Sequence, residues 1–219
     1  MKTILYISSS ARQFTPEQVD HQSISRALGE AFIQEFKVHY SQTEVIYRDL
    51  SVTPPSFIST DFLAASFGDD SKGEQQAVLA ESDALIQEVI DADVIVLSSP
   101  MYNYGMPAVL KAWFDQVIRI NKTFTFDLAR GDKPLSPILS GKQLVLLASW
   151  GEFDFKKGDS QYFMNHLTSH IEQLAPYLGA ERFFEVASEY QEFNDKRHLE
   201  SKAQAFVEAK VLARELALT

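Results

Sequence analysis

The chain has 219 residues, with 20 Lys and Arg against 30 Asp and Glu, a formal net charge of −10, and hydrophobic residues at 45% of its positions. This acidic balance argues against nucleic acid and against an anionic membrane surface as partners. The absence of cysteine excludes disulfides, thiol nucleophiles and iron–sulfur clusters.

The sequence predicts a single cytoplasmic domain that spans residues 1–219. The apolar run after Met1 and Lys2 is too short for the core of a signal peptide. No apolar run approaches the roughly 18 residues that a membrane-spanning helix needs. Composition does not change along the chain, and its apolar fraction is sufficient for one core.

The N-terminal segment predicts a phosphate site. A buried strand, Thr3–Ile7, ends in the polar loop Ser8–Arg12, and Ser23 is the natural N-cap of a helix with apolar residues at 3.6-residue spacing. First-turn N–H groups and hydroxyls would donate to an anion at such a junction. Neither G-x-x-x-x-G-K-[ST] nor G-x-G-x-x-G occurs, which disfavours a P-loop or a dinucleotide-binding Rossmann fold.

The next segment contains an outer strand and an apolar insertion. The strand, Glu44–Leu50, alternates in polarity. Apolar side chains between Pro54 and Gly73 are too numerous for a solvated linker, so we expect them to pack on a neighbour, such as a second subunit. A helix is expected from Gln75 to Asp91 and a buried strand from Asp93 to Leu97.

The loop Ser98–Pro107 follows this buried strand and leads into an amphipathic helix that begins at Pro107. Ligands of open α/β sheets bind at such carboxyl ends of strands. The sequence Pro100-Met101-Tyr102-Asn103-Tyr104, followed by Pro107-Ala108-Val109-Leu110-Lys111 and Phe114-Asp115, resembles the flavin loop of the FMN-dependent NADH:quinone and azo-dye oxidoreductases. Members of that family are flavodoxin-like.

Two more buried strands are expected, Gln143–Ala148 and Phe183–Ala187, with one helix between them striped by apolar residues from Phe163 to Leu178. A closing helix runs from Asp195 to Leu218. His166 and His170 lie four residues apart, but no Glu follows the first of them, so we expect packed histidines and no metal site.

Alternating strands and helices predict an α/β fold with a parallel sheet that is covered on both faces. The resemblance implies that this α/β fold is flavodoxin-like, with a doubly wound five-stranded sheet in the order 2-1-3-4-5. Loop insertions are expected near residues 13–22, 55–72 and 151–162. Its ligand crevice is expected between the first and third strands.

The resemblance implies that three loops bind FMN. The phosphate is assigned to Ser10, Ser23, Ile24 and Ser25. The isoalloxazine ring is assigned to Met101, Tyr102, Asn103 and Tyr104, with Asn103 at its polar edge and Tyr104 on the substrate side.

The turn assigned to the pyrimidine end consists of Ser149, Trp150, Gly151 and Glu152. Glu152 replaces a glycine of the family pattern, so its carboxylate either lies near the flavin or points away from it. Trp150 is placed to cap the core. Phe124 is either an aromatic residue near the exposed face of the flavin or a buried anchor of its loop.

The resemblance also implies a ping-pong enzyme that takes hydride from NADH or NADPH and passes two electrons to a quinone or azo compound. It would act as a homodimer, without a catalytic side chain, because the flavin carries the chemistry. The alternative is a flavodoxin-type electron carrier, which would lack the insertions. A serine hydrolase is disfavoured because no G-x-S-x-G occurs, and a regulatory domain without a cofactor is not excluded by fold.

Overall fold

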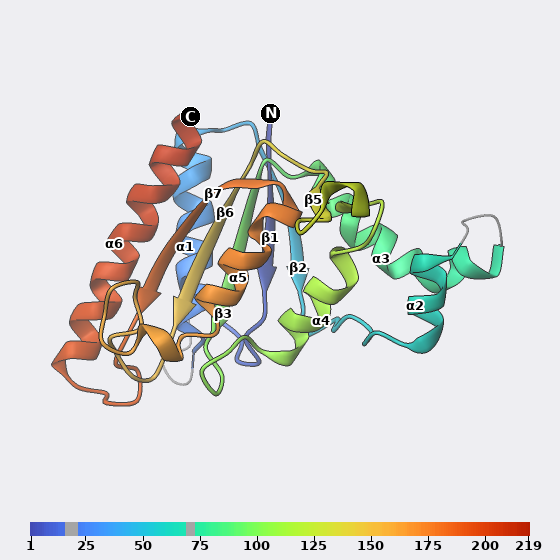
Figure 1. Cartoon of the computed structure of the whole chain (residues 1–219). Helices are drawn as coiled ribbons and strands as arrows, with labels where there is room; N and C mark the ends of the chain where they lie inside the picture. Colours follow the sequence, from blue (N-terminus) through green and yellow to red (C-terminus); the bar gives the residue numbers. More distant parts are fainter. Residues whose placement is uncertain (16–21, 69–72) are drawn as a thin grey trace.

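A computed structural model describes residues 1–15, 22–68 and 73–219 (Figure 1). Its elements, in chain order, are β1 (Lys2–Ser8), α1 (Ile24–His39), β2 (Thr43–Asp49), α2 (Thr60–Phe67), α3 (Gly73–Asp91), β3 (Val94–Pro100), α4 (Ala108–Val117), β4 (Phe124–Phe126), η1 (Leu128–Arg130), β5 (Leu135–Pro137), β6 (Lys142–Ser149), η2 (Tyr162–Met164), α5 (Thr168–Leu174), η3 (Ala175–Leu178), β7 (Ala180–Ser188) and α6 (Lys196–Leu218). The predicted insertions near residues 13–22 and 55–72 lie partly outside the described residues. No helix within the described ranges has both the length and the apolar character needed to cross a membrane.

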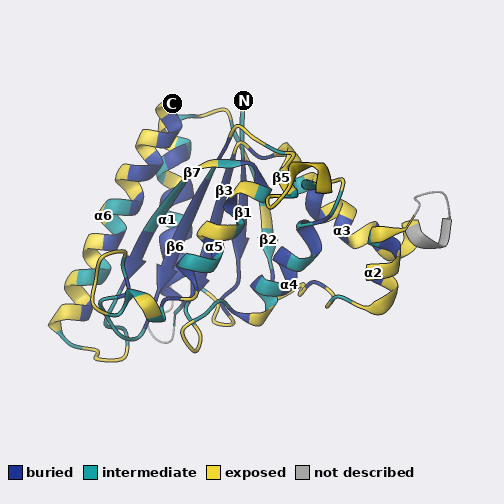
Figure 2. Ribbon diagram, in the orientation of Figure 1, coloured by how far each residue is buried: buried dark blue, intermediate teal, exposed yellow. Residues whose placement is uncertain are grey.

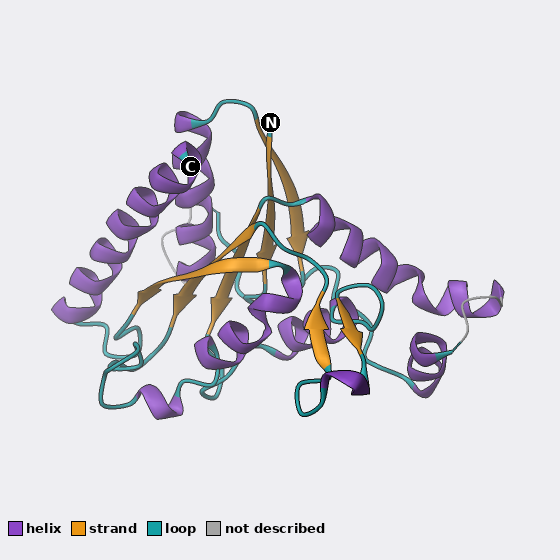
Figure 3. Cartoon of the chain, turned by 45° about the horizontal axis from the view of Figure 1, so that its top comes forward, coloured by secondary structure: helices purple, strands orange, loops and turns teal. Residues whose placement is uncertain are grey.

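Five parallel strands form the central sheet, in the order β2-β1-β3-β6-β7. The strands β4 and β5 pair with each other in a separate antiparallel ribbon, so the order of the main sheet is the predicted 2-1-3-4-5. The carboxyl ends of the five strands gather at one edge, away from the two chain termini (Figures 1 and 3). Because β1 pairs with both β2 and β3, the strand order reverses beside β1, and this is the switch point at which a ligand is expected.

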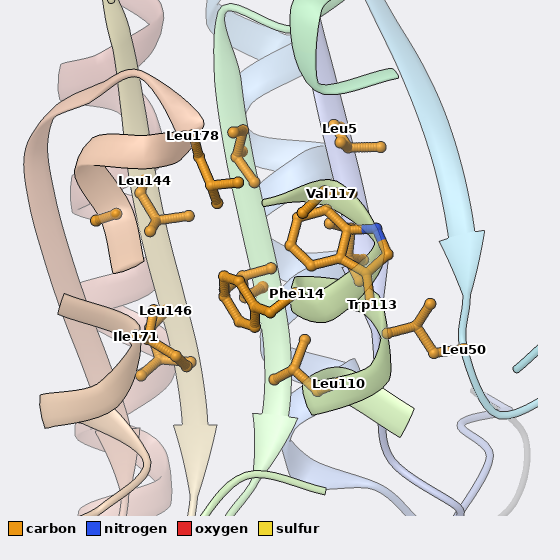
Figure 4. Packing of buried hydrophobic residues seen from close by; sticks show 14 of the residues in the cluster. Leu5, Leu50, Leu110, Trp113, Phe114, Val117, Leu144, Leu146, Ile171 and Leu178 are labelled. Carbon is orange, nitrogen blue, oxygen red and sulfur yellow. The ribbon is translucent and has the colours of Figure 1, made fainter. Parts of the chain in front are cut away.

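The sheet is buried on both faces because successive residues of its inner strands belong to two separate cores (Figure 2). Ile4 and Tyr6 of β1 join the core beneath α1 and α6, whereas Leu5 and Ile7 join the core beneath α3, α4 and α5. Figure 4 shows the second core, where Trp113 lies against the sheet. This arrangement explains why the inner strands are continuous apolar runs.

Helix α1 packs closely against β1 at Gly29. A Cβ atom on Gly29 would lie 2.4 Å from the hydroxyl oxygen of Tyr6. Tyr6 is only 4% exposed, and its ring packs edge-on against Tyr47 of β2 at 5.7 Å. The absence of a side chain at Gly29 therefore permits this spacing between the helix and the sheet.

The apolar insertion forms a helix, α2, that the sequence did not predict. Ser59 caps it by accepting a hydrogen bond from the backbone N–H of Phe62 at 3.1 Å. Phe62 and Ala65 bury their side chains against Leu79 of α3, and this helical arm projects from the body of the fold (Figure 1). The arm thus has a small core of its own.

The prediction of one continuous helix from Phe163 to Leu178 is wrong. The segment forms three short pieces, η2, α5 and η3, and Phe163 is 76% exposed. The side-chain oxygen of Asn165 accepts hydrogen bonds from the backbone N–H groups of Leu167 and Thr168, which starts α5. Pro176 lies in the first turn of η3, and Gly179 ends it with a φ of 82°.

Candidate functional site

Loops after β1, β3, β6 and β7 meet at the carboxyl edge of the sheet. They enclose a cavity of about 360 Å³ that continues into a hollow of about 250 Å³. The predicted site residues that line these spaces are Ser10, Ser23, Ile24, Met101, Tyr102, Asn103, Tyr104, Ser149, Trp150, Gly151 and Glu152. We call the part near Ser10 and Ser23 the phosphate end, and the part near Asn103, Tyr104 and Glu152 the ring end.

The phosphate end lies at the N-terminus of α1. Ser23 caps the helix, since its hydroxyl accepts a hydrogen bond from the backbone N–H of Arg26 at 3.3 Å. The earlier N–H groups of the first turn have no intrahelical partner and are suited to an anion. Ser25 is fully buried and does not line the cavity, but its hydroxyl lies 3.2 Å from that of Ser23.

An ion pair between the buried Arg26 and the half-buried Asp49 supports this end from behind. The Arg26 guanidinium donates to both carboxylate oxygens of Asp49 (2.7 and 2.8 Å), to the backbone oxygen of Ser10 (2.8 Å) and to the hydroxyl of Ser51 (2.9 Å). Burial alone would raise the pKa of Asp49, but the hydrogen bonds from Arg26 and Ser51 outweigh it and lower the pKa to about 2. Arg26 thereby joins the loop after β1 to the end of β2.

The loop after β3 forms a tight turn at the ring end. The backbone N–H groups of Tyr102 and Gly105 each donate to the other residue's carbonyl, at 2.9 and 3.0 Å. Asn103 and Tyr104 both have positive φ, 48° and 65°, as a type I′ turn requires. Asparagine tolerates this conformation well, whereas for tyrosine it is strained. The turn leaves Tyr104 39% exposed over the hollow.

Backbone hydrogen bonds join the turn after β6 to the loop after β7. Three N–H groups donate to carbonyls across the two loops: Tyr190 to Glu152 at 2.8 Å, Gln191 to Trp150 at 3.3 Å, and Glu192 to Gly151 at 3.1 Å. The ring of Trp150 is 2% exposed and belongs to the core, as predicted. The two loops thus form one wall of the cavity.

The carboxylate of Glu152 faces the ring end and does not point away from it. The hydroxyl of Tyr104 donates to Glu152 Oε1 at 3.1 Å. This hydrogen bond, with the nearby charge of Glu152, raises the pKa of Tyr104 above its ordinary value. Glu192 lines the same hollow.

Several lining residues were missed by reasoning from the sequence. Arg12 and Gln22 lie at the phosphate end, and Gln191 and Glu192 lie on the β7 side. The only available indication was that the stretch from Glu189 to Asp195 is polar and follows a predicted strand. Phe124 does not line the cavity but packs edge-on against Tyr177 at 5.8 Å. Within the described ranges, no group of three or more His, Asp or Glu residues is arranged to hold a metal ion.

The donor set of the cavity fits the cofactor that the resemblance implies. The phosphate end offers the hydroxyls of Ser10 and Ser23, the first-turn N–H groups of α1 and the guanidinium of Arg12. These are the groups that bind a phosphate ester without a glycine-rich loop. The ring end offers aromatic and amide side chains and loop backbone, which suit a planar heterocycle with polar edges.

The chain is similar to proteins of known family. It matches the family described as "Flavodoxin-like fold" over residues 2–211. It is 53% identical over 99% of its length to the whole of FMN-dependent NADH:quinone oxidoreductase 2 of Colwellia psychrerythraea. It is 54% identical over its full length to the corresponding protein of Idiomarina loihiensis, of which it covers 92%.

Solved structures agree with the fold. A FMN-dependent NADH-azoreductase from Bacillus anthracis, determined in complex with FMN, superposes with a TM-score of 0.83 over 99% of this chain and 100% of that one. Sequence identity in that pair is 18%. At this level the likeness supports the architecture alone.

Proposed function

Because the chain belongs to the family of flavodoxin-like FMN-dependent NADH:quinone oxidoreductases, we propose that it binds FMN in this cavity and uses NADH to reduce quinones and azo compounds. The observation that carries the proposal is the two-ended cavity at the β1/β3 switch point. One end suits a phosphate and the other suits a flavin ring. FMN, when bound, supplies the two-electron redox chemistry.

The residues of this chain bind and orient the reactants. The hydroxyls of Ser10 and Ser23, the N-terminal amides of α1 and the guanidinium of Arg12 hold the phosphate. The buried side chain of Trp150 makes its turn a dry, fixed wall. Tyr104, whose hydroxyl donates to Glu152, presents its ring on the open side of the hollow, where the substrate enters. No catalytic side chain is assigned.

We also propose that the protein is a cytoplasmic homodimer that binds neither nucleic acid nor membrane. Phe57, Leu63 and Phe67, on and beside α2, are 76%, 48% and 70% exposed. Next to them, apolar side chains of α2 and α4 border a hollow of about 290 Å³. A second copy of the chain would cover these side chains, and light scattering should then give twice the 24.7 kDa of one chain.

The test of the proposed enzyme begins with the absorption spectrum of freshly purified protein. Heat release and chromatography should yield about one FMN per chain. A colourless protein that does not take up added FMN would overturn the whole proposal.

The loaded protein is then mixed with NADH and a small quinone, without a partner protein. Double-reciprocal plots against NADH at several quinone concentrations should be parallel, because donor and acceptor react in turn at one site. Converging lines would instead indicate a ternary complex. Absence of turnover with FMN bound would favour the electron carrier.

A further inference from the structure

We propose that Glu152 and Glu192 select the electron acceptor by charge, favouring neutral and cationic quinones and azo compounds over sulfonated or carboxylated ones. We call these two side chains the acidic rim. The inference rests on the proposed function and deepens it by naming the class of acceptor.

The acidic rim stands at the entrance to the ring end. Both carboxylates line the hollow of about 250 Å³, together with Asn103 and Tyr104. An acceptor that approaches a ring through this hollow therefore comes close to both of them. Arg12 does not line this hollow, but Glu192 also borders the phosphate-end cavity, whose lining it shares with Arg12.

Each side chain has a defined contact at the ring end, although Glu192 is exposed and Glu152 is half-buried. The carboxylate of Glu152 accepts the hydrogen bond from the Tyr104 hydroxyl at 3.1 Å. The side chain of Glu192 lies directly over Gly151, since a Cβ atom on that glycine would be 2.7 Å from its Cγ, Cδ and Oε1 atoms. The hydrogen bonds between the two loops fix the backbone beneath both side chains.

No Lys, Arg or His side chain forms a salt bridge with the acidic rim within residues 1–15, 22–68 and 73–219. Neither Glu152 nor Glu192 takes part in an ion pair there. Arg197, on the same side of the fold, instead pairs with Asp195 at 2.6 Å and lies over the rings of Tyr190 and Phe193. The raised pKa of Tyr104 has the charges of both rim carboxylates among its causes.

Two negative charges at the mouth of a cleft repel an anionic acceptor, because low-dielectric walls focus the field there. Removing both charges should raise the rate constant for an anionic acceptor roughly tenfold relative to that for a neutral one. A cationic acceptor should change in the opposite direction.

The test compares the wild type with Glu152→Gln, Glu192→Gln and the double variant. Glutamine keeps the shape of the side chain and, at residue 152, an oxygen that accepts from Tyr104. Glu215→Gln is the matched control, because Glu215 is exposed near the far end of α6. The acceptors are 1,4-naphthoquinone and two derivatives of it, one with a sulfonate and one with a trimethylammonium group.

Chemically reduced, FMN-loaded protein is mixed with each acceptor in a stopped-flow instrument, so that NADH, itself an anion, does not enter the measurement. Dissociation constants of the unreactive naphthalene-2-sulfonate, followed by flavin absorbance, give a second readout without turnover. Affinity for this anion should rise in the double variant, and added salt should reduce the difference from wild type.

The proposal is supported if the ratio of the rate constants for the sulfonated and the neutral acceptor rises tenfold in the double variant and does not change in Glu215→Gln. If the rate constants for all three acceptors change equally, or do not change, the acidic rim does not select acceptors by charge, and the proposed function still stands. Failure of every acceptor to oxidise the wild type would instead overturn the proposed function.

Discussion

Replacing Asp49 with Asn should destabilise the protein, because it leaves the Arg26 guanidinium without its counter-ion. Arg26 is 8% exposed, and the Asp49 side chain is 30% exposed. Asparagine can accept one hydrogen bond from the guanidinium but carries no charge. The attachment of the Ser10 loop to β2 through Arg26 is weakened at the same time.

The magnitude follows from the pKa of Asp49, which lies at about 2 against an ordinary 3.8. The difference of roughly two pH units, at ~1.36 kcal/mol per unit and reduced for solvent screening of the partly exposed carboxylate, corresponds to about 2 kcal/mol of folding free energy at pH 7. Because the pKa of the folded state is the lower one, this stabilisation is fully present well above pH 3.8. It disappears as the pH falls toward 2.

Urea unfolding of the FMN-free protein measures the effect. The difference in unfolding free energy between the wild type and Asp49→Asn should be about 2 kcal/mol at pH 7, remain constant down to about pH 5, and be about 1 kcal/mol smaller at pH 3. Asp132→Asn, in the exposed loop before β5, should match the wild type at every pH. A difference that is absent at pH 7, or that does not become smaller in acid, would show that the charge of Asp49 does not stabilise the fold.

Two further predictions concern the same end of the molecule. Gly29→Ala should lower the melting temperature by a few degrees, because the clash with the buried ring of Tyr6 outweighs the better helix propensity of alanine. In a Tyr6→Leu background, Gly29→Ala should no longer lower the melting temperature. If it lowers the melting temperature as much as it does in the wild type, the alanine clashes with a group other than the Tyr6 ring. Arg12→Gln should weaken FMN binding roughly tenfold in a fluorescence titration of the apoprotein, since a charge-assisted bond to phosphate is lost. Lys133→Gln, in the exposed loop before β5, should leave FMN binding unchanged. If the wild type, Arg12→Gln and Lys133→Gln bind FMN equally well, Arg12 does not contact the phosphate.

The main sheet could be predicted from the sequence because its inner strands are buried on both faces. Their uninterrupted apolar runs are therefore unambiguous, and the helices between them fix the parallel arrangement. The ribbon of β4 and β5 was missed because strands of three residues are too short to show alternation. The helix α2 was missed because aromatic side chains lie on both its buried and its exposed sides, as Phe62 and Phe67 show.

The site was predictable where one loop carries a recognisable local pattern. Eleven of the twelve predicted residues line the cavity or its hollow, and Ser25 lies behind Ser23. Their binding of FMN stays a prediction. Gln191 and Glu192 were missed because they reach the cavity through hydrogen bonds to a loop about forty residues earlier, a tertiary contact with no local pattern.

Those same hydrogen bonds make the ring end and the outer strand of the sheet one cooperative unit. The loop that follows β7 is bonded to the turn at residues 150–152, and the backbone N–H of Glu189 donates a hydrogen bond to the Ser201 hydroxyl of α6 at 2.9 Å. Neither loop can open without breaking bonds to the other. A ligand that immobilises the turn after β6 would therefore also slow the fraying of β7 and of the start of α6, although most of those residues never touch it.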